Sequence, residues 1–191
     1  MEKDKHARWT HFFKEDIRRF KPAEFNLIFI QQHGLTLAAL LGYAFHTDRQ
    51  VAFRAAWMLE HVLLNAPEQI PSVFGDLTTR LGEQKNWSAI RSFTKIGMAS
   101  TDRRNTIPYT QAQEAVWIEQ CFQWLIDPSC PVAVVVNCLD ILSNLSSRHD
   151  WVRDELAAQI HFLLNTTPTP ALTSRAQRVL KRIRPPAQGA G

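Results

Sequence analysis

The segment between His46 and Pro67 reads as a helix that is apolar on nearly every side. At about 100° per residue, one broad face holds only apolar side chains: Val51, Ala55, Met58, Leu59 and Val62. A second apolar side is made of Phe53, Trp57 and Leu64. The polar positions fall largely in one line: Gln50, Arg54, His61 and Asn65. Such a helix must be packed on several sides at once, which predicts an inner helix in a stack of helix pairs.

The apolar pattern recurs three times further along the chain. A shift of 37 residues aligns Arg54 with Arg91, so that AFR falls on AIR. Shifts of 80 and 121 residues bring the apolar face onto 135–142 and 172–183. The steps between the copies are therefore 37, 43 and 41 residues. Helical solenoid repeats have periods of roughly 34 to 47 residues, so the spacing predicts a repeat array.

An amphipathic segment precedes each of these helices, which predicts four helix pairs. The run VAVVV at 132–136 also fits a strand, but it lies in the repeat frame and is assigned to a helix. Residues 5–33 are predicted to form a pair of N-terminal capping helices, and residues 35–184 the repeats. The fold class is then all-α, an α-α superhelix of about four pairs plus the capping pair. We expect a single domain over 1–184 and a disordered tail over 185–191.

These repeats resemble HEAT repeats. The family's inner-helix pattern, Asp-x-x-Val followed by small and large apolar positions, is matched by Asp48, Val51, Ala55 and Leu59. The segment DPSCPV at 127–132 resembles the Asp-Pro turn that leads into such helices. HEAT repeats often carry Arg directly after the Val, whereas this chain has Ala52 there. Over about residues 35–184 the chain is also similar to a group of small bacterial HEAT-like proteins. The resemblance implies an α-solenoid.

Charge is distributed unevenly along the chain, whose formal net charge is +4. Residues 1–155 carry 17 basic and 18 acidic side chains, so this part is nearly neutral. Residues 156–191 carry no acid and five basic side chains: Arg175, Arg178, Lys181, Arg182 and Arg184. We interpret them as the polar outer face that a terminal repeat needs, the alternative being a contact with nucleic acid or lipid headgroups.

Nothing in the sequence indicates secretion, a membrane or a cofactor. The N-terminus is charged, and the longest apolar run, at 35–45, is far shorter than the roughly 20 residues of a membrane span. The three cysteines, Cys121, Cys130 and Cys138, have neither disulfide-framework nor metal-site spacing. No zinc, redox, phosphate-loop or serine-nucleophile motif occurs. We therefore expect a cytoplasmic, non-enzymatic protein without catalytic residues, metal or cofactor.

The candidate binding site is the concave surface of the array. Polar positions of the inner helices are predicted to line it: Gln50, Arg54, His61, Ser88, Arg91, Lys95 and Arg175. Arginines 54, 91 and 175 share one position of the repeat frame, and a line of guanidiniums suits carboxylate or phosphate recognition. The alternative is that each arginine pairs with an acid or a carbonyl of a neighbouring repeat.

Non-catalytic binding of a protein or an acidic peptide in this groove is the expected function. The alternative is a nucleic-acid-binding protein, or an enzyme of the HEAT-like DNA glycosylase type. A third possibility is a structural role in a larger assembly through Trp9, Phe12 and Phe13. Most of the six tryptophans are predicted to lie in the core, with Trp87 the one expected to be partly exposed.

Overall fold

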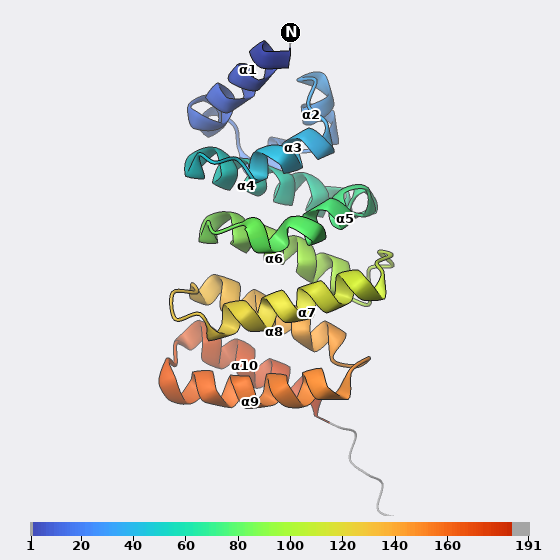
Figure 1. The fold of residues 1–191 in the computed structure, drawn as a ribbon, viewed down its shortest axis with the longest axis vertical. Coiled ribbons are helices and arrows are strands. Elements are labelled where there is room, and N and C mark those ends of the chain that lie inside the picture. The colour runs from blue at the N-terminus through green and yellow to red at the C-terminus, as the bar shows by residue number, and fades with distance from the viewer. Residues whose placement is uncertain (1, 185–191) are drawn as a thin grey trace, which may run out of the picture.

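The computed structural model describes residues 2–184, which form a stack of helices along one long axis (Figure 1). In chain order the α-helices are α1 (Glu2–Lys14), α2 (Leu27–Gln32), α3 (Leu37–Ala44), α4 (Arg49–Asn65), α5 (Pro71–Arg80), α6 (Trp87–Thr101), α7 (Gln111–Ile126), α8 (Val132–Leu145), α9 (Asp150–Thr166) and α10 (Pro170–Ile183). Short 3-10 turns lie at Asp16–Arg19, Pro22–Glu24, Pro67–Gln69 and Leu81–Glu83. No strand occurs within 2–184, and none of the helices there is long and apolar enough to cross a membrane. The tail expected to be disordered, 185–191, lies outside the described residues.

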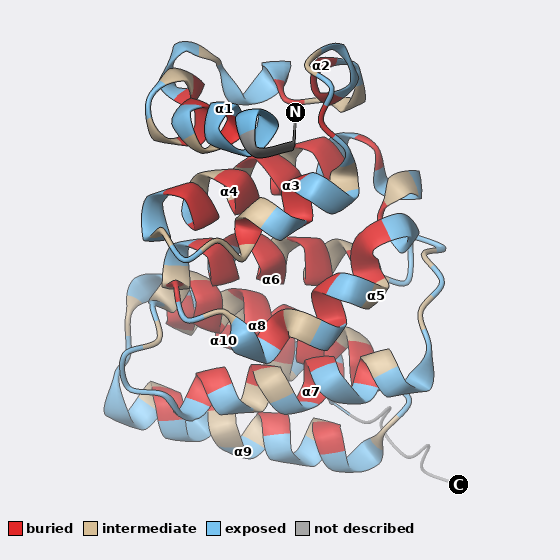
Figure 2. Cartoon of the chain, turned by 45° about the horizontal axis from the view of Figure 1, so that its top comes forward, coloured by how far each residue is buried: buried red, intermediate tan, exposed pale blue. Residues whose placement is uncertain are grey.

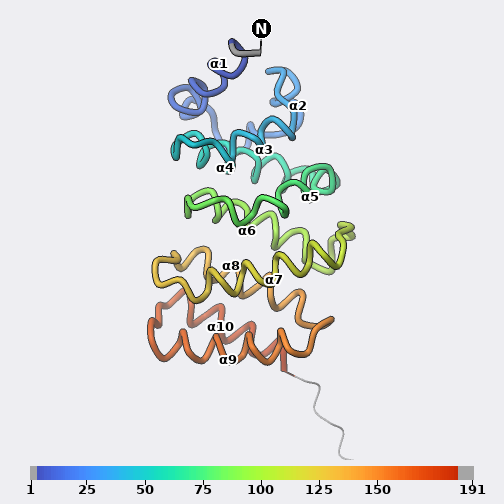
Figure 3. Tube along the Cα trace, viewed as in Figure 1, coloured from blue at the N-terminus to red at the C-terminus, as the bar shows by residue number. Residues whose placement is uncertain are grey.

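Four helix pairs follow one another along the stack: α3/α4, α5/α6, α7/α8 and α9/α10 (Figures 1 and 3). The inner helices α4, α6, α8 and α10 each contact the next one, and the outer helices α3, α5 and α7 do the same. Helices α1 and α2 lie at the N-terminal end, where α1 packs on α4. The predicted all-α superhelix is confirmed, and the run at 132–136 is helical.

Short polar side chains set the first residue of several helices. The Asp48 carboxylate accepts hydrogen bonds from the N–H groups of Gln50 and Val51, and Asn86 accepts one from Ser88 N. Thr169 caps α10 in the same way. These bonds satisfy N–H groups that have no partner inside the helix, so they fix the rotational phase at which α4, α6 and α10 begin.

The structure corrects the repeat frame by one residue. Because α4 and α6 begin after the equivalent N-caps Asp48 and Asn86, Arg54 corresponds to Ser92, and Arg91 to Phe53. The fully buried positions agree with this register, since Val51, Ala55 and Met58 correspond to Ala89, Phe93 and Ile96. The expected equivalence of Arg54 and Arg91 is therefore wrong. The segments AFR and AIR have similar residues, but the positions that are buried in α4 and α6 determine which residues are equivalent.

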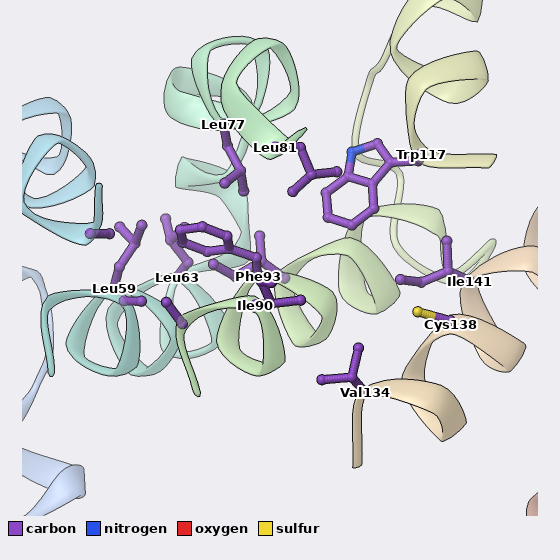
Figure 4. Close-up of a cluster of buried hydrophobic side chains, with 14 of the residues drawn as sticks. Leu59, Leu63, Leu77, Leu81, Ile90, Phe93, Trp117, Val134, Cys138 and Ile141 are labelled. Carbon is purple, nitrogen blue, oxygen red and sulfur yellow. The ribbon is translucent and has the colours of Figure 1, made fainter. Parts of the chain in front are cut away.

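The core lies between the inner and outer layers and continues from pair to pair (Figure 4). Figure 2 shows α6 buried over most of its length, as expected for a helix that packs against α4 and α8 and also meets Trp117 of α7. The close-up shows side chains of successive pairs gathered in one buried cluster, among them Leu63, Phe93, Trp117 and Ile141. Burying such a side chain stabilises the fold by roughly 1.5–3 kcal/mol, so the pairs depend on one another for stability.

Gly97 allows a close approach between the second and third helix pairs. A Cβ atom at this position would lie 2.5 Å from Trp117 Cζ3 and 3.1 Å from Ile141 Cδ1. The Trp117 indole therefore packs directly on the α6 backbone at Gly97. Two residues of α5 also contact it. Its ring stacks on Phe74 with 5.8 Å between centroids, and its N–H donates to Thr78 Oγ1 at 3.0 Å.

The tryptophans are mostly in the core and Trp87 is partly exposed, as expected, but another tryptophan is more exposed. Trp9, Trp117 and Trp124 are buried, whereas Trp57 and Trp87 are partly covered. Trp151 is the exposed tryptophan of the described chain, at 59 %. It lies on the face of α9 turned away from the buried residues of that helix, which the sequence-based grouping into apolar stripes did not resolve.

Candidate binding groove

Three of the predicted groove residues hold the N-terminal unit in place instead. The Arg54 guanidinium donates to the carbonyl oxygens of Phe13, at 2.8 Å, and Lys14, at the end of α1. Gln50 Nε2 also donates to Lys14 O, at 3.2 Å. His61 lies against Phe25 of the N-terminal unit, with 6.5 Å between ring centroids. The last carbonyl groups of a helix lack hydrogen-bond partners inside the helix. Arg54 and Gln50 donate to two of these carbonyl groups of α1 and so connect α1 to α4.

Burial at this joint lowers the pKa of both ionisable groups. Desolvation is the main cause for Arg54, with the nearby charge of Arg18 adding to it. Desolvation also lowers the pKa of His61, which favours the neutral imidazole. These residues act as joint residues, and placing them on an open concave surface was wrong.

Asp48 adds an ion pair to the same joint, and this pair predicts an acid-sensitive contact. Lys14 Nζ lies 2.5 Å from Asp48 Oδ2. Its hydrogen bond and that of Val51 N lower the pKa of the Asp48 carboxyl from 3.8 to about 2. Because the folded-state pKa is depressed, this stabilisation is present above about pH 4 and is lost as the pH falls toward 2. Asp48→Asn keeps a helix cap but removes the titration.

We expect Asp48→Asn to reduce the loss of stability between pH 6 and pH 2.5. Urea unfolding of wild type and variant at both pH values measures it. The matched control is Asp154→Asn, an exposed carboxylate on α9. An equal acid-induced fall in wild type and Asp48→Asn would contradict the assigned role of the Lys14 pair.

The remaining α6 residues of the prediction lie on the open side of the inner layer. Ser88 and Arg91 are exposed, and within residues 4–184 the Arg91 guanidinium has neither an ion pair nor a hydrogen bond. Lys95 instead reaches back to α4, where its Nζ lies 2.5 Å from Glu60 Oε1. Glu60 is only 2 % exposed, so Lys95 neutralises a carboxylate that is buried between two inner helices.

A groove of about 690 Å³ opens where α6, α8 and α10 pass one another, beside the loop after α6. It brings together Lys95 and Arg175 of the predicted set, but not the other five residues. Its polar lining is Lys95, Asp102, Arg104, Asn105, Asn137, Asp140, Asn144, Arg175, Arg178 and Arg182. The predicted concave site therefore lies closer to the C-terminal end of the stack than the sequence indicated.

Asp140 on α8 organises two arginines of α10. Arg182 Nη2 lies 3.1 Å from Asp140 Oδ1, and Arg175 pairs with the other carboxylate oxygen. Asp140 is 8 % exposed. Burial is the main cause that lowers the pKa of both guanidiniums. Of the three arginines expected to line the concave surface, Arg175 pairs with an acid and Arg54 binds carbonyl oxygens of a neighbouring unit. Arg91 does neither within the described residues.

Cations exceed carboxylates in this groove. Its five basic side chains face two lining carboxylates and the buried Glu60. Arg104 binds Asp102 through two nitrogens, which lowers the pKa of that carboxyl. Arg178 has no carboxylate partner in the described chain, and its Nε donates weakly to Ser174 O at 3.4 Å. An unneutralised guanidinium therefore remains at the rim, next to two that share one acid.

Amides and hydroxyls fix the floor of the groove. Asn137 Nδ2 donates to Thr94 Oγ1 at 2.9 Å, and Asn144 Nδ2 donates to Thr101 Oγ1 at 3.1 Å. These bonds join α8 to α6 at both ends of the Asp140 position. The floor is therefore built before any ligand arrives, which lowers the entropic cost of binding.

A spacing signal in the sequence could have located this groove. Asn137, Asp140 and Asn144 stand at i, i+3 and i+7 in a helix that is apolar apart from these residues and Ser143, so they share one face. Arg175, Arg178 and Arg182 repeat the same spacing on the next inner helix, α10. In the sequence alone, the three arginines of α10 fit the polar outer face of a terminal repeat. In the structure they line the groove.

Comparison with known proteins agrees with this architecture. A family model described as a HEAT repeat domain matches residues 26–183, which covers all four helix pairs. Searches of the curated proteins and of the solved structures returned no match. The match extends over most of the chain and ends at the last residue of α10. The chain therefore belongs to the HEAT repeat family.

Proposed function

We propose that this protein is a non-catalytic binding protein whose groove holds an acidic segment of a partner protein. HEAT repeats commonly act as protein-interaction scaffolds. One observation carries the finer proposal: Arg178 lacks a carboxylate partner in the described chain, beside Arg175 and Arg182, which share Asp140. A partner carboxylate at this point would neutralise charge that the protein itself leaves unbalanced.

The ion pairs with Asp140 orient the guanidinium groups of Arg175 and Arg182. A guanidinium that is already paired on one edge keeps other N–H donors for a second acceptor. Glutamate or aspartate side chains of the partner would accept these hydrogen bonds, which are charge-assisted and stronger than neutral ones. The excess positive charge would also accelerate encounter with an acidic segment.

Three observations favour this function over action on nucleic acid. The residues lining the groove include no aromatic side chain on which a base could stack. Both carboxylates that line it are already bound by arginines, which leaves neither placed as a free catalytic acid of a glycosylase-type site. The cations also cluster at one end of the stack and do not run along it.

The test is the affinity of a fluorescein-labelled, glutamate-rich 12-residue peptide for wild type and for Arg178→Glu. We expect reversal of this charge to weaken binding at least tenfold, about 1.4 kcal/mol, because a repulsive group replaces the free donor. Arg8→Glu is the matched control, since Arg8 is exposed on α1 at the other end of the array. It should change the affinity less than twofold.

A duplex DNA probe distinguishes the proposed function from the alternative, binding of nucleic acid. Binding of DNA that falls steeply between 50 and 200 mM salt, without binding of the peptide, would overturn the proposal. Equal weakening by Arg178→Glu and Arg8→Glu would show that only the overall charge matters, and this too would contradict the groove.

A further inference from the structure

A second groove, of about 660 Å³, lies on the outer layer between α7 and α9. It shares no lining residue with the groove formed by α6, α8 and α10. Its apolar surface is made by Ala115, Ile118, Phe122, Ile126 and Trp151. This site is independent of the function proposed above, because different helices of the array form it.

Large apolar side chains are left exposed at this groove. Ile126 is 69 % exposed and Trp151 is 59 % exposed. The rings of Phe122 and Trp151 lie 6.1 Å apart between centroids, so one aromatic wall spans the two helices. Exposed tryptophan beside a concave apolar surface is characteristic of binding hot spots. The cost of hydrating these side chains would fall if another apolar surface covered them.

The polar groups around the apolar surface are acidic. Glu119 lies on α7 and Glu155 on α9, so the groove runs between two carboxylates, and no lysine or arginine lines it. Glu119 accepts only a 3.3 Å hydrogen bond from Gln123, and Glu155 has no partner within residues 4–184. His149 is already held 2.7 Å from the buried Glu114. The two grooves therefore carry charge of opposite sign.

We propose that this outer groove, which we call the α7/α9 groove, binds an amphipathic basic helix of a partner protein. Apolar residues at i, i+3 and i+4 of that helix would cover Trp151, Phe122 and Ile126. Its lysines or arginines would lie against Glu119 on one side and Glu155 on the other. Charge complementarity selects this partner over an acidic segment, which the two unpaired carboxylates would repel.

The probe is a labelled 14-residue helix of leucine and lysine, LKKLLKLLKKLLKL, and its counterpart has glutamate at every lysine. We expect the lysine helix to bind wild type and Trp151→Ala to weaken it at least tenfold. Glu119→Gln/Glu155→Gln should weaken binding about threefold or more and flatten its dependence on salt. Phe162→Ala is the matched control, because Phe162 is 58 % exposed on the same helix but lies outside the groove. That variant should bind within twofold of wild type.

The outcomes separate this site from the groove proposed for acidic segments. Arg178→Glu should leave binding of the lysine helix unweakened, so failure of one proposal would not hide the other. Unchanged affinity in Trp151→Ala, tighter binding of the glutamate helix or no binding of the lysine helix at 100 µM would each overturn the assignment. A wild-type dimer that Trp151→Ala dissociates in light scattering would show a second copy in the groove, and would also overturn it. Circular dichroism melts of each variant serve as the control for folding, and the exposed substitutions should leave them unchanged.

Discussion

Trp117→Ala is expected to lower the free energy of unfolding by about 3–5 kcal/mol. Trp117 is 1 % exposed and fills the space between the second and third helix pairs. Alanine would remove its stacking on Phe74 and its hydrogen bond to Thr78, and would open a void above Gly97. Since each pair of a solenoid is stabilised mainly by its neighbours, a defect at this junction affects the whole array. Chemical denaturation followed by circular dichroism measures the effect.

Gly97 supplies the control for this prediction. In wild type, Gly97→Val should also destabilise strongly, because its Cβ would lie 2.5 Å from Trp117 Cζ3. In the Trp117→Ala background the same valine would enter the void and should cost clearly less. A double-mutant cycle measures this coupling. Additive effects of the two changes would show that the indole does not rest on Gly97.

Lys95→Met is expected to lower the free energy of unfolding by about 2–4 kcal/mol. The substitution keeps the aliphatic length but leaves the Glu60 carboxylate without its cation at 2 % exposure. Breaking a buried ion pair from one side is costly because the remaining charge stays desolvated. The lysine side chain is 36 % exposed, which allows water to approach and places the effect toward the lower end. Urea unfolding at pH 7 measures it.

Two variants separate the pair from a general loss of charge. Lys95→Met/Glu60→Leu removes both charges and should recover most of the stability, since apolar replacement of a whole buried pair is often neutral. Arg91→Met is the matched control on the same helix face, where the guanidinium is exposed and unpaired in the described chain, and it should change stability by less than about 0.5 kcal/mol. A double variant as unstable as Lys95→Met would contradict the interpretation.

The architecture could be predicted from the sequence because buried helix faces require apolar residues at regular intervals. Val51, Ala55 and Met58 mark an inner face that only a packed helix requires, and similar faces recur at intervals that suit a solenoid. The exact register was not accessible from matching letters. The phase of α6 depends on its N-cap at Asn86, which the alignment of AFR with AIR ignored.

The candidate site was only partly predictable, for a geometric reason. Lys95 and Arg175 of the predicted set line one groove, but Arg54 faces the carboxyl end of α1. Polar positions on an inner helix look alike in sequence whether they meet solvent or a preceding unit. Which of the two occurs depends on how the N-terminal unit docks, and Asp140 became visible as an organiser only once α8 and α10 were side by side.

An acidic partner is proposed to bind in the groove of α6, α8 and α10. Backbone amide NMR, with the glutamate-rich peptide titrated into the intact protein, tests it most directly. The largest shifts should cluster at 137–144 and 175–182, and they should disappear in Arg178→Glu. Shifts that concentrate instead on α7 and α9, on the joint around Arg54, or evenly over the surface would contradict the account.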